Sequence, residues 1–114
     1  DNMRAAGMTD GTYELGEQKV SVRGTLATLE DGTIAGSVTS LPECLRYVVQ
    51  KAGIPLEEAL ACVTMNPAKS LGIYESRGSV SVGKQADLVL LDEELRVRAV
   101  LKAGQVVKSK VICE

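Results

Sequence analysis

The sequence of 114 residues contains no histidine, tryptophan or phenylalanine, and its only aromatic side chains are three tyrosines. The absence of histidine removes the commonest metal ligand and the commonest general base, which argues against a self-contained metalloenzyme or a Ser-His hydrolase. The scarcity of aromatic rings argues against a base-stacking platform for single-stranded nucleic acid. A net charge of −2 argues against nucleic acid or an anionic membrane as the main partner.

Cysteine is also scarce, with Cys44, Cys62 and Cys113 widely spaced along the chain. Their odd number and spacing argue against a disulfide framework and against a zinc ribbon. Cys44 and Cys62 fall on the apolar faces of expected helices, so we expect both to be buried as small hydrophobic side chains. This cysteine usage suits a reducing compartment and predicts a cytoplasmic location.

Long apolar runs are missing as well. No run approaches the roughly 20 residues of a membrane span, and the first 25 residues lack the features of a signal peptide. The 114 residues, 45% of them hydrophobic, suffice for one small domain with a core. They fall short of the roughly 250 residues of a complete (β/α)8 barrel.

The first third of the chain has the pattern of β structure. Residues 1–11 are small, polar and Gly-punctuated, which predicts a loop. Residues 12–33 alternate apolar with polar side chains between turn-forming glycines, which predicts a β-hairpin or a three-stranded meander. Residues 32–40, with two glycines four residues apart and small side chains, permit a close approach of the backbone to another group, or form a linker.

Helical periodicity begins at residue 40. Ser40 and Glu43 form a capping-box pattern, and a 3.6-residue apolar period then runs to Gly53. A second helix is expected from Pro55. Asn66 and Pro67 have the pattern of an N-cap followed by Pro at N1, which predicts a third helix that ends at Gly72.

The period changes from 3.6 to two after Gly78. Val80 and Val82 alternate with serines, and the apolar run in residues 86–92 predicts a strand that is buried on both faces. Residues 95–103 alternate as in a half-buried strand, and Gly104 turns the chain into a partner strand over 105–112. The expected class is therefore α+β.

The segment TMNPAKSLGIYESRGSVSVGKQADLVLLD, residues 64–92, resembles the C-terminal signature of the amidohydrolase superfamily. The matching positions are Asn66, Pro67, Ala68, Lys69, Leu71, Gly72, Gly78, Val80, Gly83, Lys84, Ala86, Asp87, Leu88, Val89 and Asp92. The resemblance implies that this segment returns the chain from a barrel to a small β-sandwich. Its residues have structural roles, with Asp87 placed to accept hydrogen bonds from backbone amides.

The preceding part of the chain resembles the N-acetylglucosamine-6-phosphate deacetylase family. The matching positions are Asp1, Met3, Arg4, Ala6, Gly7, Tyr13, Leu15, Gly16, Val20, Val22 and residues 31–37. Asn2, Glu17 and Ile34 depart from the family's usual residues. The implied fold is an α+β fragment at the end of a (β/α)8 metal-dependent hydrolase barrel. Residues 1–72 would supply the last strand exit and C-terminal helices, with a β-hairpin insertion near 12–30. Residues 73–114 would supply strands of the small β-sandwich.

This resemblance also implies functional roles for four residues. Asp1 aligns with a catalytic carboxylate that moves a proton from the attacking water to the departing amine. Ile34, Ala35 and Gly36 align with a loop that lines the pocket for the N-acetylated sugar. The family uses a divalent metal, zinc or iron, whose Glu and His ligands lie on earlier strands. This chain holds none of those ligands, and Glu14, Glu17 and Glu30 are expected to be solvated.

The expected function is hydrolysis of N-acetylglucosamine 6-phosphate to glucosamine 6-phosphate and acetate by an intact enzyme, with the 114 residues inactive alone. A homo-oligomer is expected, a homodimer for the intact enzyme. Two alternatives stay open: a dihydroorotase-like or other cyclic-amide hydrolase, and a non-catalytic α+β interaction module. The signature in residues 64–92 fits all of the hydrolases, and only residues 1–37 favour the sugar deacetylase.

Overall fold

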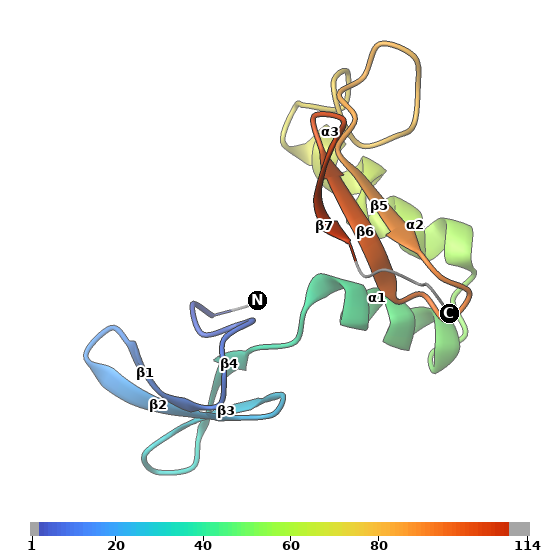
Figure 1. Cartoon of the computed structure of the whole chain (residues 1–114). Coiled ribbons are helices and arrows are strands. Elements are labelled where there is room, and N and C mark those ends of the chain that lie inside the picture. The colour runs from blue at the N-terminus through green and yellow to red at the C-terminus, as the bar shows by residue number, and fades with distance from the viewer. Residues whose placement is uncertain (1–2, 110–114) are drawn as a thin grey trace. The chain divides into compact units, whose positions relative to one another are not determined.

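The computed structural model describes residues 3–109 and separates the chain into two compact units, residues 1–40 and 41–114. Four strands come first in the chain, then three helices, then three more strands (Figure 1). Strands and helices are thus segregated along the sequence, and both sheets are antiparallel. The expected α+β class is confirmed.

The first unit is a four-stranded meander. Its strands β1 (Gly11–Leu15), β2 (Gln18–Arg23), β3 (Leu26–Leu29) and β4 (Ile34–Ser37) pair in sequence order. Alternation in β2 places two valines in a core that also takes in β3 and the segment before β1. The buried members of this core are Ala5, Val20, Val22 and Ala27. The sheet is therefore one strand larger than the expected three-stranded meander, because the Gly-rich segment after residue 33 pairs with β3.

A tight turn joins β3 to β4. The Asp31 carboxylate accepts the Thr33 backbone N–H at 2.9 Å, and Gly32 adopts a φ of 86°. Hydrogen bonds from Thr33 hold the pKa of Asp31 below its usual value. The Leu29 N–H donates to the Thr33 carbonyl at 2.8 Å, which closes the turn. The Asp-Gly turn signal in the sequence thus marks a real reversal of the chain.

The second unit begins with the helices α1 (Leu41–Gln50), α2 (Leu56–Val63) and α3 (Met65–Ser70). Gly53, with a φ of 75°, follows α1 at the expected stop. After α3 the Ile73 N–H donates to the Ala68 carbonyl and the Gly72 N–H to the Lys69 carbonyl, which is a Schellman motif around left-handed Gly72.

The expected start of the third helix was wrong by two residues. Helix α3 begins at Met65, so Asn66 lies inside its first turn and Thr64 is the cap residue. Pro67 is tolerated there because the first N–H groups of a helix have no intrahelical acceptor. The Asn66 amide contacts the Cys62 sulfur, at 4.0 Å, instead of capping the helix.

A three-stranded sheet completes the second unit, with β5 (Leu88–Leu91), β6 (Val97–Lys102) and β7 (Gln105–Ser109) in that order. The expected burial of β5 on both faces was wrong, because β5 is an edge strand and Val89 and Leu90 are exposed. The half-buried β6 and its partner strand are confirmed over the described residues.

The expected strand around Val80 and Val82 was also wrong. Both valines are exposed and lie in an irregular segment. Gly78 and Gly83 flank this segment with φ values of 93° and 90°, and the Lys84 N–H donates to the Ser81 carbonyl. Two left-handed glycines so close together turn the chain too sharply for a strand.

Cys44 and Cys62 are exposed free thiols, which corrects the expectation that both are buried; Cys113 lies outside the described residues. Only Leu45 of α1 and Ala59 of α2 are buried among the residues of those two helices. The apolar stripes of the helices line a groove of about 830 Å³, together with β5 and residues before it. A helical period identifies an apolar face but not whether another layer covers that face.

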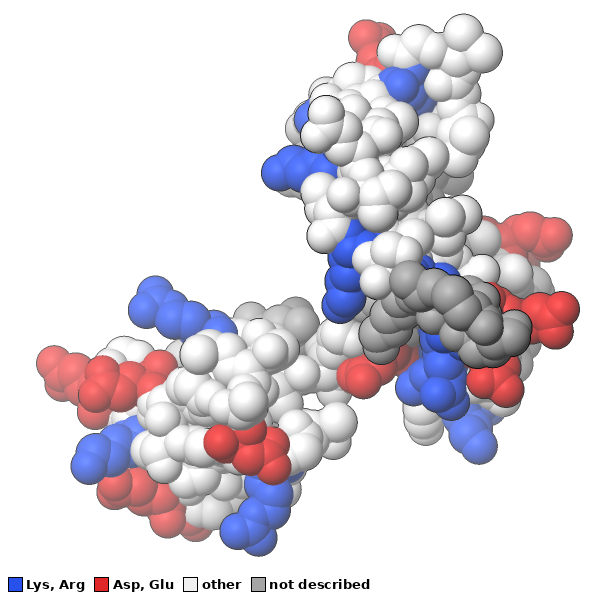
Figure 2. All heavy atoms as spheres, in the orientation of Figure 1, with Lys and Arg blue, Asp and Glu red and all other residues white. Residues whose placement is uncertain are grey.

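The surface carries charges of both signs. On the face shown in Figure 2, acidic and basic side chains are interspersed over both units and form no single basic patch. No helix among the described residues is long and apolar enough to cross a membrane.

Candidate functional site

The segment before the first strand is fixed against β4 of its own unit. The Met3 N–H donates to the Ser37 carbonyl at 2.9 Å. The Ala6 N–H then donates to the Met3 carbonyl at 3.0 Å, and Ala5, which is 2% exposed, enters the core of the sheet. One backbone bond and one buried side chain therefore fix the segment next to the strand that contains the expected substrate residues.

Those substrate residues lie on a strand rather than on the expected loop. Ile34, Ala35 and Gly36 are the first three residues of β4. Ala27 pairs with Gly36 and Thr28 with Ile34, so Ala35 is the extra residue of a β-bulge. Bulges change the direction in which side chains point and often occur beside active sites. The three residues are thus held by a sheet and share one irregular stretch of it.

Each of the three residues presents a different group. The Ile34 side chain is 70% exposed, whereas Ala35 packs against the core of the sheet. A Cβ added at Gly36 would lie 3.7 Å from both the Cβ and the sulfur of Met3. Met3 is therefore the side chain nearest to this position, and an added Cβ would be in ordinary van der Waals contact with it.

Asp1, the expected catalytic residue, lies outside the described residues. The structure brings Met3 close to the β4 residues. Met3 belongs to the first motif of the sugar-deacetylase resemblance, residues 1–7, and the β4 residues belong to another, residues 31–37. Sequence reasoning assigned no role to Met3, although it stands in the first motif. Its contact with Gly36 joins residues distant in the sequence and has no local signal.

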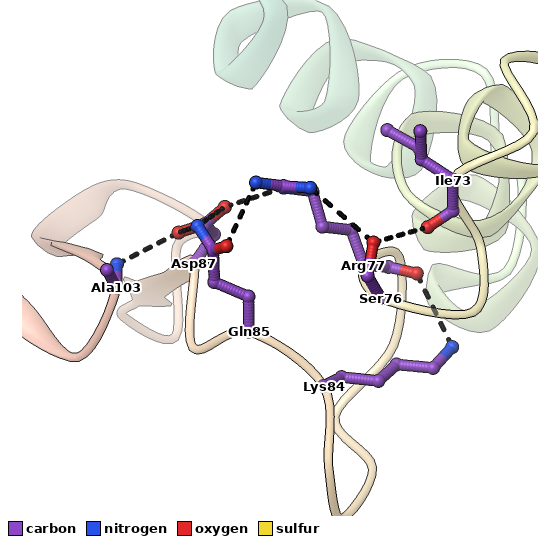
Figure 3. Close-up of polar contacts among 7 residues, drawn as sticks. All are labelled: Ile73, Ser76, Arg77, Lys84, Gln85, Asp87 and Ala103. Atoms are coloured by element: carbon purple, nitrogen blue, oxygen red, sulfur yellow. Dashed lines mark hydrogen bonds and ion pairs between the residues drawn. The ribbon is translucent and has the colours of Figure 1, made fainter.

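Residues of the 64–92 signature build a polar network with Ala103 in the second unit (Figure 3). The Asp87 carboxylate accepts the Ala103 backbone N–H at 2.9 Å and the Arg77 Nε–H at 3.1 Å. The Gln85 amide also donates to Asp87, at 3.0 Å. The Ala103 amide foremost, then Gln85 and Arg77, hold the pKa of Asp87 below its usual value. The expected hydrogen bond of Asp87 to backbone amides is confirmed.

Lys84 and Tyr74 extend this network. The Lys84 ammonium lies 3.5 Å from the centroid of the Tyr74 ring, and the Lys69 ammonium lies 5.0 Å from the same centroid. Lys84 also donates to the Arg77 carbonyl at 3.4 Å. These contacts tie the loop 73–87 to the start of β5 and to the β6–β7 turn.

The described residues do not fit a metal site. They contain no group of three or more His, Cys, Asp or Glu side chains placed to hold an ion. Glu14, Glu17 and Glu30 are exposed, as expected for solvated residues. The ligands of the divalent metal implied by the resemblance would therefore have to come from outside the part of the chain described here.

Comparison with known proteins assigns the chain to a family. The amidohydrolase family profile matches residues 5–108. Proteins named N-acetylglucosamine-6-phosphate deacetylase from Caenorhabditis elegans and Bacillus subtilis (strain 168) are each 41% identical over 106 residues, 92% and 93% of this chain. The crystal structure of N-acetylglucosamine-6-phosphate deacetylase from Pasteurella multocida matches 96% of the chain with a TM-score of 0.88 and 30% identity.

The chain spans only part of each of these proteins: 25% of the C. elegans relative, 27% of the B. subtilis relative and 29% of the P. multocida structure. Nevertheless, the family profile takes in both units, the N-terminal sheet as well as the helices and the second sheet. The chain belongs to the amidohydrolase family, as the sequence predicted.

Proposed function

We propose that this chain is part of an N-acetylglucosamine-6-phosphate deacetylase and supplies its catalytic carboxylate and one strand of its substrate site. The observation that carries the proposal is the 41% identity to proteins of that name over 106 residues. Only eight of the 114 residues can lie outside such a match, so it must include most of the first unit, where the sugar-deacetylase motifs occur.

The proposed reaction is hydrolysis of an acetamide. The oxygen of a water molecule bonds to the acetyl carbonyl carbon, and the carbon–nitrogen bond breaks. Asp1 accepts the proton that the water loses and delivers it to the departing nitrogen, so that the products are an amine and acetate. A carboxylate suits this shuttle because it can act first as base and then as acid.

The proposed substrate contacts come from β4. The side chain of Ile34 is exposed, and the bulge at Ala35 places its backbone outside the regular ladder. In support, Met3 is hydrogen-bonded to Ser37, so the segment that follows Asp1 in sequence runs beside this strand. The proposal further includes residues 1–72 as the barrel part, residues 73–114 as the sandwich part, a homo-oligomeric enzyme and a cytoplasmic location.

The test is a chimera in which this chain replaces the corresponding segment of the B. subtilis relative. We expect the chimera to release glucosamine 6-phosphate and acetate from N-acetylglucosamine 6-phosphate. Asp1→Asn should lower kcat by about 10²- to 10⁴-fold, because it removes general acid–base catalysis. Glu17→Gln, a neutralisation on the exposed β1–β2 turn, is the matched control and should leave kcat unchanged.

Two outcomes would contradict the proposal. A folded chimera that lacks deacetylase activity but hydrolyses dihydroorotate would favour the cyclic-amide alternative. A near-normal kcat in Asp1→Asn would remove Asp1 from the reaction while leaving the family assignment intact.

A further inference from the structure

Met3 lies in the segment that follows Asp1 in the sequence, and it is bonded to β4. Its backbone N–H is bonded to the Ser37 carbonyl at 2.9 Å, and its side chain packs against the core that contains Ala5 and Val20. Its Cβ and sulfur also lie 3.7 Å from the point where Gly36 would carry a Cβ. Met3 thus bonds to β4 at Ser37 and borders the space in which a side chain of the preceding residue, Gly36, would lie.

We infer that Met3 is a positioning residue. It holds the catalytic segment, which is the stretch that follows Asp1 in the sequence, at a fixed distance from the proposed substrate strand β4. This inference rests on the proposed function, because it gives Asp1 and β4 their roles. The backbone bond sets the distance between the segment and the strand, and the thioether fills the space above Gly36. A flexible, polarizable side chain suits the irregular surface of a bulged strand.

The contact also changes how Gly36 is understood. The glycine does not adopt a left-handed conformation, so backbone strain does not explain it. A single added carbon would already be in contact with Met3, at 3.7 Å. We therefore expect the two further methyl groups of a valine to crowd the methionine. Gly36 therefore leaves room for Met3, and a larger residue there would displace the segment that leads to Asp1.

The kinetic expectation follows from this geometry. A shift of the catalytic segment by a fraction of an ångström to one ångström lowers the rate of the chemical step more than it weakens binding of the ground state. Met3→Ala in the chimera should therefore lower kcat by about ten- to a hundredfold with a smaller change in KM. Met3→Leu, which keeps the volume, should restore most of kcat. Met8→Ala is the matched control, since Met8 lies in the same segment and is exposed.

Gly36→Val provides a second, independent measurement. It should also lower kcat more than it raises KM, because it acts through Met3. In the double variant with Met3→Ala, the valine methyl groups occupy the space that the methionine leaves, so kcat should exceed that of Met3→Ala alone. Thermal unfolding of each variant establishes that it is folded. If Met3→Ala does not fold, the kcat and KM of Gly36→Val alone decide the question.

The outcomes separate the two proposals. A wild-type chimera that is folded but inactive overturns the proposed function. An active chimera in which Met3→Ala behaves like Met8→Ala overturns the role of Met3. A Gly36→Val variant that only raises KM also overturns it, because the valine would then block the sugar directly.

Discussion

At the scale of single residues, Gly78 is the most tightly constrained glycine of the described chain. It has a φ of 93°, and a Cβ there would lie 2.6 Å from the Cβ of Ala68 and 3.3 Å from the Thr64 carbonyl oxygen. Gly78→Ala combines an unfavourable backbone conformation with overpacking against α3. We expect it to lower the free energy of unfolding by about 2–4 kcal/mol, measured by urea denaturation.

Gly83→Ala is the control for this prediction. Gly83 has nearly the same φ, 90°, but an added Cβ would have no atom within 4 Å. Its substitution should therefore carry the backbone strain alone, about 1–2 kcal/mol. Equal losses in the two variants would show that Gly78 is required for its conformation and not for its close approach to α3.

At the scale of the elements, Asp87 connects the start of β5 to the β6–β7 turn and to Arg77. Because its pKa is lowered in the folded chain, Asp87 stabilises the fold above the ordinary pKa of 3.8, and this contribution is lost as the pH falls through the lower, folded value. Asp87→Asn should therefore lower the Tm at pH 7, and the difference from the wild type should shrink below about pH 3.8. Thermal unfolding followed by circular dichroism at several pH values measures both.

The matched control for Asp87→Asn is Glu75→Gln, since Glu75 is an exposed acid of the same unit. It should change the Tm little at any pH. A loss in Asp87→Asn that persisted undiminished at pH 2 would show that the amide disrupts packing rather than removing the charged hydrogen bonds.

These elements also show how much of the fold could be predicted from the sequence. The helices followed from local signals, namely the 3.6-residue period and the glycines after α1 and α3, and all three formed, although α3 starts earlier than expected. The strand at Val80 was wrong because left-handed Gly78 and Gly83 turn the chain there, and the burial of Cys44 was wrong because it depends on whether another layer covers the helix. The substrate role of Ile34–Gly36 stays a prediction from the family resemblance, whereas the bulge at Ala35 and the proximity of Met3 arise only from strand pairing.

At the scale of the whole molecule, the chain belongs to the amidohydrolase family, and it spans only part of the length of its relatives. The sequence contains no histidine, and its described residues form no cluster that could hold a metal. An apolar groove of about 830 Å³ runs along the helices and β5, lined by side chains such as Leu60, Leu71 and Val80. The chain resembles a quarter to a third of a known enzyme in sequence and in fold.

This incompleteness predicts that the 114-residue chain is inactive alone, with or without added Zn²⁺ or Fe²⁺. Calorimetric titration with either ion should show no stoichiometric binding, and incubation with N-acetylglucosamine 6-phosphate should release no free amine. The chimera with the B. subtilis relative, assayed alongside, should release amine under the same conditions. Turnover by the isolated chain would mean that its own residues assemble a metal site or act without one. That result would contradict the proposal that this chain supplies the carboxylate and the substrate strand while the rest of the protein supplies the metal ligands.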